Sequence, residues 1–188
     1  MPEPRTHVKV TAAGAATEAR LFKSGAFVAD PWIAVGADAT LPPEGAILVP
    51  LARWRAERAA LVARGEPVGV VVTPPEVLED GDEVARLGVV VLRIAKFTDG
   101  RAYSTARRLR EGGFVGEIRA SGDVLLDQLA LLARCGFDAF EITHGPTLRA
   151  LQRGAVPGLS HVYQAPTSAD PLGPGFGARH RRRVASIV

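Results

Sequence analysis

The stretch from Lys96 to Glu141, KFTDGRAYSTARRLREGGFVGEIRASGDVLLDQLALLARCGFDAFE, reads as two consecutive strand–loop–helix units. Short apolar runs alternate with segments of helical periodicity, which is the pattern of a parallel sheet whose strands are joined through helices. Each strand-to-helix loop carries many ionisable and hydroxyl side chains. In α/β proteins such loops lie at the carboxyl ends of the strands, where binding sites form. We therefore expect both the fold and the function to be organised around this stretch.

The same alternation extends on both sides of this stretch. The strands are predicted at 47–50, 68–73, 89–95, 117–120 and 138–142, and the helices at 51–64, 103–111, 124–134 and 146–152, with a short further helix opening at 74–76. This order predicts an α/β fold of about five parallel strands in consecutive βα units with right-handed crossovers. An open doubly wound sheet and a partial (βα) barrel both fit. Charged residues inside the strands favour the barrel-like curvature, because they could pair across neighbouring strands on a face that is partly open to solvent. These residues are Arg93, Glu117, Arg119 and Glu141.

The chain divides into three regions by composition. Residues 1–45 are expected to form an N-terminal arm that packs on the domain, with a hairpin at 21–28 and Trp32 as its anchor. Residues 46–164 form the α/β domain. Residues 165–188 are rich in Pro, Gly and Arg and lack periodicity, so we expect a disordered basic tail.

The composition favours some classes of protein over others. The chain has 188 residues, of which 47% are hydrophobic and 23% charged, as in an ordinary soluble domain. Its apolar runs are too short to cross a membrane, and no secretory signal is recognisable, so a cytoplasmic location is expected. Four arginines at 179–183 account for the net charge of +3, and this argues against a basic nucleic-acid-binding face on the domain. The composition is compatible with a monomer and with a homo-oligomer.

The two polar loops predict an anion-binding site. We expect Asp99-Gly100 to form a tight turn with a positive φ at the glycine, and Ser104 or Thr105 to cap the following helix. Two helix N-termini and three cationic side chains would then favour a phosphate, sulfate or carboxylate. The candidate catalytic residues are Lys96, Asp99 and Asp123, the candidate anion-binding residues are Lys96, Arg101, Ser104, Arg119 and Ser121, and the supporting residues are Tyr103, Asp127, Gln128 and Glu141.

Structural roles compete with these chemical ones. Asp123 is favoured as the N-cap of the 124–134 helix over a general base, and Asp127 could equally complement the helix dipole. Cys135 ends a helix and is expected to be a packing residue with a raised pKa. No histidine or cysteine spacing indicates a metal site, and no glycine-rich phosphate motif occurs, so the cofactor stays unknown.

Several blocks of this sequence resemble the bacterial domain-of-unknown-function family 934. The blocks KFTDGR-x-YS and GD-V-x-x-DQ carry the resemblance, together with LPPEGAILVPLARW and VYQAP, over roughly residues 28–165. The family usually has Phe-Pro where this chain has Ile94-Ala95, and an apolar residue where it has Ser121. Neither difference changes one of the ionisable residues assigned to the candidate site.

The resemblance implies a link to sulfur assimilation. Genes of the family tend to lie beside those for assimilatory sulfite reductase and adenylylsulfate-type reductases, and its members are labelled oxidoreductases of sulfite reduction. Reduction of sulfite to sulfide requires sirohaem coupled to an iron–sulfur cluster, which a chain with one cysteine cannot ligate. We therefore expect an accessory protein that binds an anion or docks on one of those reductases. The alternative is a small enzyme that acts on an anionic intermediate, with Asp99 or Asp123 as base and three cations, Lys96, Arg101 and Arg119, as the clamp.

Overall fold

The computed structural model describes residues 19–79, 81–96 and 98–155, and the predicted basic tail lies outside this range. The described chain forms one sheet of eight strands in the order β2-β1-β8-β7-β6-β5-β4-β3. Its elements are β1 (Arg20–Lys23), β2 (Ala26–Val28), β3 (Ile33–Ala34), β4 (Ile47–Pro50), α1 (Leu51–Ala63), β5 (Val68–Val72), the 3-10 helix η1 (Gly81–Glu83), β6 (Leu87–Ile94), α2 (Arg101–Glu111), β7 (Glu117–Gly122), the 3-10 helix η2 (Leu126–Gln128), α3 (Leu129–Arg134), β8 (Ala139–Ile142) and α4 (Gly145–Gln152).

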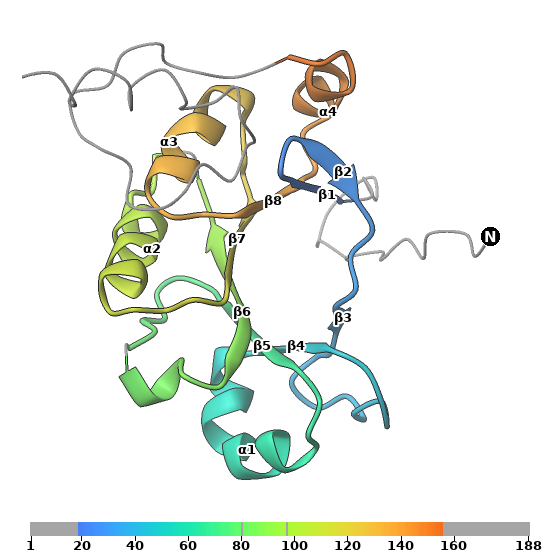
Figure 1. Cartoon of the computed structure of the whole chain (residues 1–188), viewed down its shortest axis with the longest axis vertical. Coiled ribbons are helices and arrows are strands. Elements are labelled where there is room, and N and C mark those ends of the chain that lie inside the picture. The colour runs from blue at the N-terminus through green and yellow to red at the C-terminus, as the bar shows by residue number, and fades with distance from the viewer. Residues whose placement is uncertain (1–18, 80, 97, 156–188) are drawn as a thin grey trace, which may run out of the picture.

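The sheet is mostly parallel and curls into an open half-barrel (Figure 1). Strands β3 to β8 pair in parallel, and the alternating pattern predicts β4 to β8 but not β3. Helices α1, α2 and α3 lie along the convex side. The predicted helix that opens at 74–76 is wrong, because the described residues between β5 and β6, 73–79 and 81–86, contain the 3-10 helix η1 and no α-helix. Two prolines and an interior Gly81 make this connection a poor helix former.

The N-terminal arm contributes strands to this sheet. The predicted hairpin is confirmed, with Leu21 paired to Val28 across an antiparallel turn at Ser24 and Gly25. Its first strand also pairs antiparallel with β8, and β3 pairs with β4 at the opposite end of the sheet. The arm therefore supplies both outer edges of the half-barrel.

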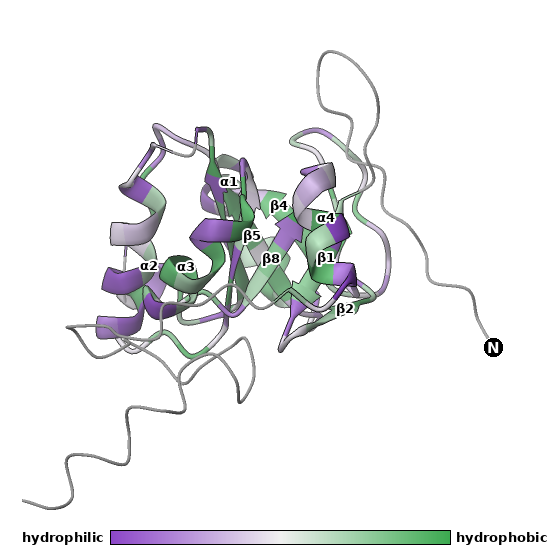
Figure 2. Cartoon of the chain, turned by 90° about the horizontal axis from the view of Figure 1, so that it is seen from above, coloured by the Kyte–Doolittle hydropathy of each residue, from purple (hydrophilic) through white to green (hydrophobic). Residues whose placement is uncertain are grey.

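Each strand has a face toward the helices and a face toward the hollow of the half-barrel. On β6, Val90 and Leu92 belong to the main core beneath the helices, whereas Val89 and Val91 form a smaller cluster on the other face. Figure 2 shows this apolar sheet bordered by helices with hydrophilic outer surfaces. Since successive residues alternate between faces, the charged residues Glu117 and Arg119 of β7 lie on the same side as this smaller cluster.

The helix starts differ from the predictions. Helix α2 begins at Arg101 with Gly100 as N-cap, so Ser104 lies inside the helix instead of capping it. Gly100 has φ −76°, and the expected positive φ is wrong. The next helical segment starts only at Leu126, so Asp123 is not its N-cap; instead the Gln128 side chain accepts a hydrogen bond from the Leu125 N–H at 3.1 Å.

Candidate functional site

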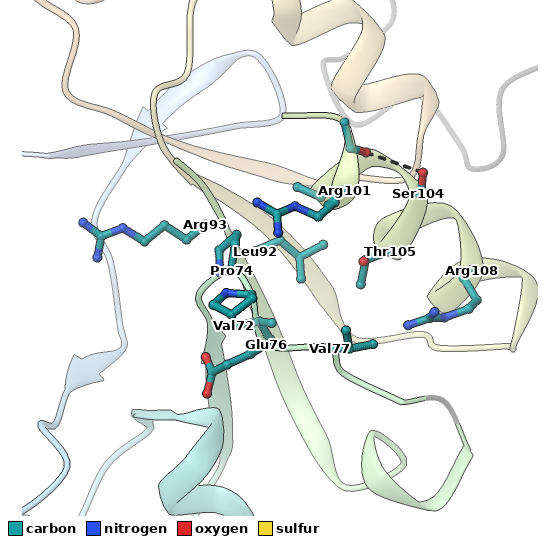
Figure 3. Close-up of a pocket in the computed structure, with 13 residues that line it drawn as sticks. Val72, Pro74, Glu76, Val77, Leu92, Arg93, Arg101, Ser104, Thr105 and Arg108 are labelled. Atoms are coloured by element: carbon teal, nitrogen blue, oxygen red, sulfur yellow. Dashed lines mark hydrogen bonds between the residues drawn. The ribbon is translucent and has the colours of Figure 1, made fainter. Parts of the chain in front are cut away.

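A pocket of about 470 Å³ lies at the carboxyl ends of β5 and β6, beside the start of α2 (Figure 3). This volume is in the range of small-molecule binding sites. Helix α2 supplies one wall, the segment after β5 supplies the opposite wall, and buried strand residues supply the floor. The lining residues are Val72, Pro74, Pro75, Glu76, Val77, Leu92, Arg93, Gly100, Arg101, Ala102, Ser104, Thr105 and Arg108.

The helical wall of the pocket is cationic and rich in hydroxyls. Arg101, Ser104, Thr105 and Arg108 follow the i, i+3, i+4, i+7 spacing that places residues on one helical face. The adjacent face, with Ala102 buried, packs into the core and fixes the orientation of the helix. The polar wall thus follows directly from the amphipathic pattern of α2.

Asp99 and Arg101 form a close pair at the start of this wall. The Arg101 Nε donates to Asp99 Oδ1 at 2.9 Å and its second terminal nitrogen donates to Oδ2 at 2.7 Å, while the Arg101 N–H donates to Oδ1 at 3.1 Å. The side-chain bonds and then the backbone bond from Arg101 lower the pKa of Asp99 to about 2. Asp99 therefore stays ionised at neutral pH, where a carboxyl of such low pKa is a weak general base.

The opposite wall is apolar and is held by arginines from two helices. Arg55 of α1 donates to the Val77 carbonyl at 2.8 Å, and Arg108 of α2 donates to the Leu78 carbonyl. Arg55 also contacts Glu83 at 2.6 Å, and this hydrogen bond lowers the pKa of the Glu83 carboxyl. These contacts fix the segment that replaces the predicted helix.

Arg93 contributes to the pocket in a different way from the α2 residues. In Figure 3 its side chain points away from Arg101 and Thr105, toward the hollow of the half-barrel. This direction follows from strand alternation, because Leu92 faces the helices and its neighbour must face the other side. The positive charge of the pocket therefore comes mainly from Arg101 and Arg108. Two carboxylates offset part of it: Asp99, which pairs with Arg101 at 2.7 Å, and Glu76, which accepts a hydrogen bond from the Thr73 N–H at 2.9 Å.

Arg119 lies outside the pocket, in a buried ionic network. Its side chain is 0% exposed and contacts Asp30 at 2.7 Å, Glu117 at 2.8 Å and Glu141 at 3.4 Å. Burial opposes its charge, but the hydrogen bonds and charges of Asp30, Glu117 and Glu141 outweigh burial and raise the pKa of the guanidinium. Lys23 adds a further contact to Glu117 at 2.5 Å. The predicted pairing across strands is confirmed for Arg119 with Glu141, and Arg119 is occupied by the protein's own carboxylates.

The other predicted residues occupy several surroundings. Lys96 is exposed in the loop after β6, and Asp123 follows β7 at the same sheet edge, where its N–H donates to the Ile94 carbonyl at 2.9 Å. Ser121 is buried on β7, on the same face as Arg119. None of these three side chains lines the pocket.

The supporting residues and Cys135 lie outside the pocket lining. Tyr103 stacks edge-on against Phe137, and burial is the largest of the effects that raise the pKa of its hydroxyl. Asp127 is exposed on η2, and the Gln128 side chain accepts a hydrogen bond from the N–H of Leu125, the N-cap of that segment. Burial raises the pKa of the half-buried Cys135 thiol, as predicted.

Sequence reasoning missed part of the pocket. Thr105 was considered only as a helix cap, and Arg108, Glu76 and Val77 were not assigned to the site. The signal for Arg108 was available, because it lies one further helical turn from Arg101 and Ser104 on the same face. The wall at Glu76 and Val77 could not be found, since it depends on a segment that is not helical.

The described residues include neither a membrane-spanning helix nor a metal-binding cluster. No helix there combines the length and apolar character that crossing a membrane would need. Within the same ranges, no group of three or more His, Cys, Asp or Glu side chains is arranged to hold a metal ion.

The chain matches the model of a known protein family. The model of a protein family described as "Bacterial protein of unknown function (DUF934)" matches residues 69–172, which is more than half of the chain. The match includes β5 from residue 69 onward, β6 to β8, helices α2 to α4 and every residue that lines the pocket. No curated protein matches the chain.

Proposed function

Because the chain belongs to the bacterial domain-of-unknown-function family 934, we propose that it is an accessory protein of assimilatory sulfate or sulfite reduction that binds an anionic ligand in the α2 pocket. The link to sulfur assimilation comes from the resemblance described above. The observation that carries the binding role is the α2 wall, on which Arg101, Ser104, Thr105 and Arg108 face one pocket. Arginines and hydroxyls together suit a tetrahedral oxyanion, because they supply both charge and directed donors.

The position of the candidate acid–base groups supports binding over catalysis. Asp99 is engaged by Arg101 and has a pKa of about 2, far from the range of an effective base at neutral pH. Lys96 and Asp123 lie at the same sheet edge but outside the pocket lining. The accessory role therefore accounts for the geometry with fewer assumptions than the alternative enzyme.

A thermal-shift titration of the full chain with sulfite, sulfate and phosphate tests the binding role. A bound anion at about a hundred times its dissociation constant adds about 2.7 kcal/mol to the free energy of unfolding. We expect this shift to be lost in Arg101→Gln and retained in Arg107→Gln, a matched control on the exposed part of the same helix, outside the pocket. An equal loss in both variants, or no shift with any anion in a titration that includes organic anions, would contradict the proposal.

A growth experiment tests the link to sulfur assimilation. A bacterium that carries this gene should lose growth on sulfate or sulfite when the gene is deleted, and should keep growth on sulfide or cysteine. The wild-type gene should restore growth on sulfate, and the Arg101→Gln gene should restore it poorly. Normal growth of the deletion strain on sulfate as the only sulfur source would refute the pathway assignment.

A further inference from the structure

We infer that the ligand of the α2 pocket is an organic anion, in which a sulfonyl or phosphoryl group contacts the α2 wall and an apolar body contacts the opposite wall. The inference rests on the proposed binding function and narrows its ligand from any anion to one chemical class. Three features of the pocket carry it: its size, the contrast between its walls, and the fixed position of the apolar wall.

The pocket is too large for an inorganic oxyanion alone. Sulfite has four heavy atoms, and if each is given the space of a water molecule it fills roughly 120 Å³. The pocket measures about 470 Å³. An inorganic anion bound to Arg101 would therefore leave most of this space to water, whereas an organic ligand would fill it.

The two walls differ in chemistry. The wall that faces α2 is formed by Pro74, Pro75 and Val77, with Glu76 as its one charged residue, and the floor is formed by the buried Val72 and Leu92. Val77 is 57% exposed, which places a large apolar side chain at the rim of the pocket, facing the α2 wall (Figure 3). A ligand with an anionic group on one side and an apolar body on the other matches this arrangement.

The apolar wall is preorganised for contact with a ligand. The Val77 carbonyl accepts from Arg55 at 2.8 Å and the Leu78 carbonyl accepts from Arg108, so two helices hold the backbone on both sides of the bond between Val77 and Leu78. A wall fixed in this way loses little conformational freedom when a ligand binds, and this favours affinity. The hydrogen bond from the Arg108 side chain to the Leu78 carbonyl also fixes the far end of the α2 wall.

Calorimetric titration of the full chain with matched probes tests the inference. The inorganic probes are sulfite, sulfate and phosphate, and the organic probes are hexane-1-sulfonate and adenosine 5′-monophosphate, which separate the sulfonyl from the phosphoryl source. We expect at least one organic probe to bind ten times more tightly, or better, than the inorganic anion with the same head group. Equal affinities would overturn the inference and leave the proposed binding function intact.

Substitution at the pocket rim tests the location of the apolar body. Val77→Trp should fill the apolar side of the pocket and weaken the organic probe at least tenfold, with little effect on the inorganic anion. Val115→Trp is the matched control, because Val115 is 96% exposed and does not line the pocket. Val77→Ser, with circular dichroism to verify folding, should weaken only the organic probe. Unchanged organic binding in both Val77 variants would overturn the inference, and absence of binding by every probe would overturn the proposed function as well.

Discussion

Replacement of Arg119 by methionine should destabilise the protein strongly, because Arg119 is the central cation of the network on the inner face of the half-barrel. Its side chain is 0% exposed and touches three carboxylates, whose own side chains are only 7% exposed for Glu141, 13% for Glu117 and 23% for Asp30. In the variant, the Lys23 side chain would still pair with Glu117. Removing one partner of a buried ion pair costs about 3–5 kcal/mol, since the opposite charge is left without compensation.

Urea unfolding followed by circular dichroism measures the loss in the free energy of unfolding, and thermal unfolding followed in the same way measures the melting temperature. At about 2–4 °C per kcal/mol for a chain of this size, the melting temperature should fall by about 6–20 °C. Lys23→Met is the matched control, because the Lys23 side chain is 42% exposed and an exposed pair contributes at most about 1 kcal/mol. A loss below about 1 kcal/mol for Arg119→Met would refute the view that Arg119 compensates the charges of these three carboxylates.

Two further predictions concern the sheet edge around the pocket. By NMR, the Asp99 carboxyl should titrate at about 2, and its pKa should rise toward about 3.9 in Arg101→Gln. Because the pKa of Asp99 is lowered in the folded state, its contribution to stability is present above the pKa of the unfolded chain and is lost as the pH falls toward 2. An Asp99 carboxyl that titrates near about 3.9 in the wild type would contradict the pairing with Arg101. Gly122→Ala should cost more than about 1 kcal/mol in urea unfolding, because φ is +94° and the new Cβ would lie 2.3 Å from the Ile94 carbonyl oxygen. Gly100→Ala, at φ −76° with open space around it, should cost less than about 1 kcal/mol, since glycine is only a modestly better N-cap than alanine, and equal losses for both glycines would contradict the reasoning.

Hydrophobic patterning predicts most of the parallel sheet. The runs at Val68–Val72 and Leu87–Ile94 are apolar because helices or loops cover one face and a second cluster covers the other, and such runs are visible without a structure. The antiparallel pairing of Arg20–Lys23 with β8 was not predicted, since it joins segments more than a hundred residues apart and leaves no local pattern. Nor could the number of strands at the edges be derived, because Ile33–Ala34 is too short for a periodic signal.

The polar loops were predicted at the carboxyl edge of the sheet, and the structure brings only part of their residues to the pocket. The carboxyl-end rule places Arg101 and Ser104 at the pocket, where the structure has them. Arg119 was added to the anion clamp because it lies near the end of the strand predicted at 117–120. In the structure β7 continues to Gly122, and strand alternation points Arg119 to the inner face, where Asp30 from the arm meets it. A partner 89 residues away could not be foreseen from spacing.

The most direct test of an anion site on α2 is an NMR titration of the ¹⁵N-labelled full chain with adenosine 5′-monophosphate and with sulfite. The account predicts that the backbone amides of Gly100, Ala102, Ser104 and Thr105 shift with saturation, that Val77 shifts with the nucleotide, and that inner-face amides such as Ala139 do not move. Shifts confined to the inner face, or no saturable shift along α2 with either probe, would contradict it.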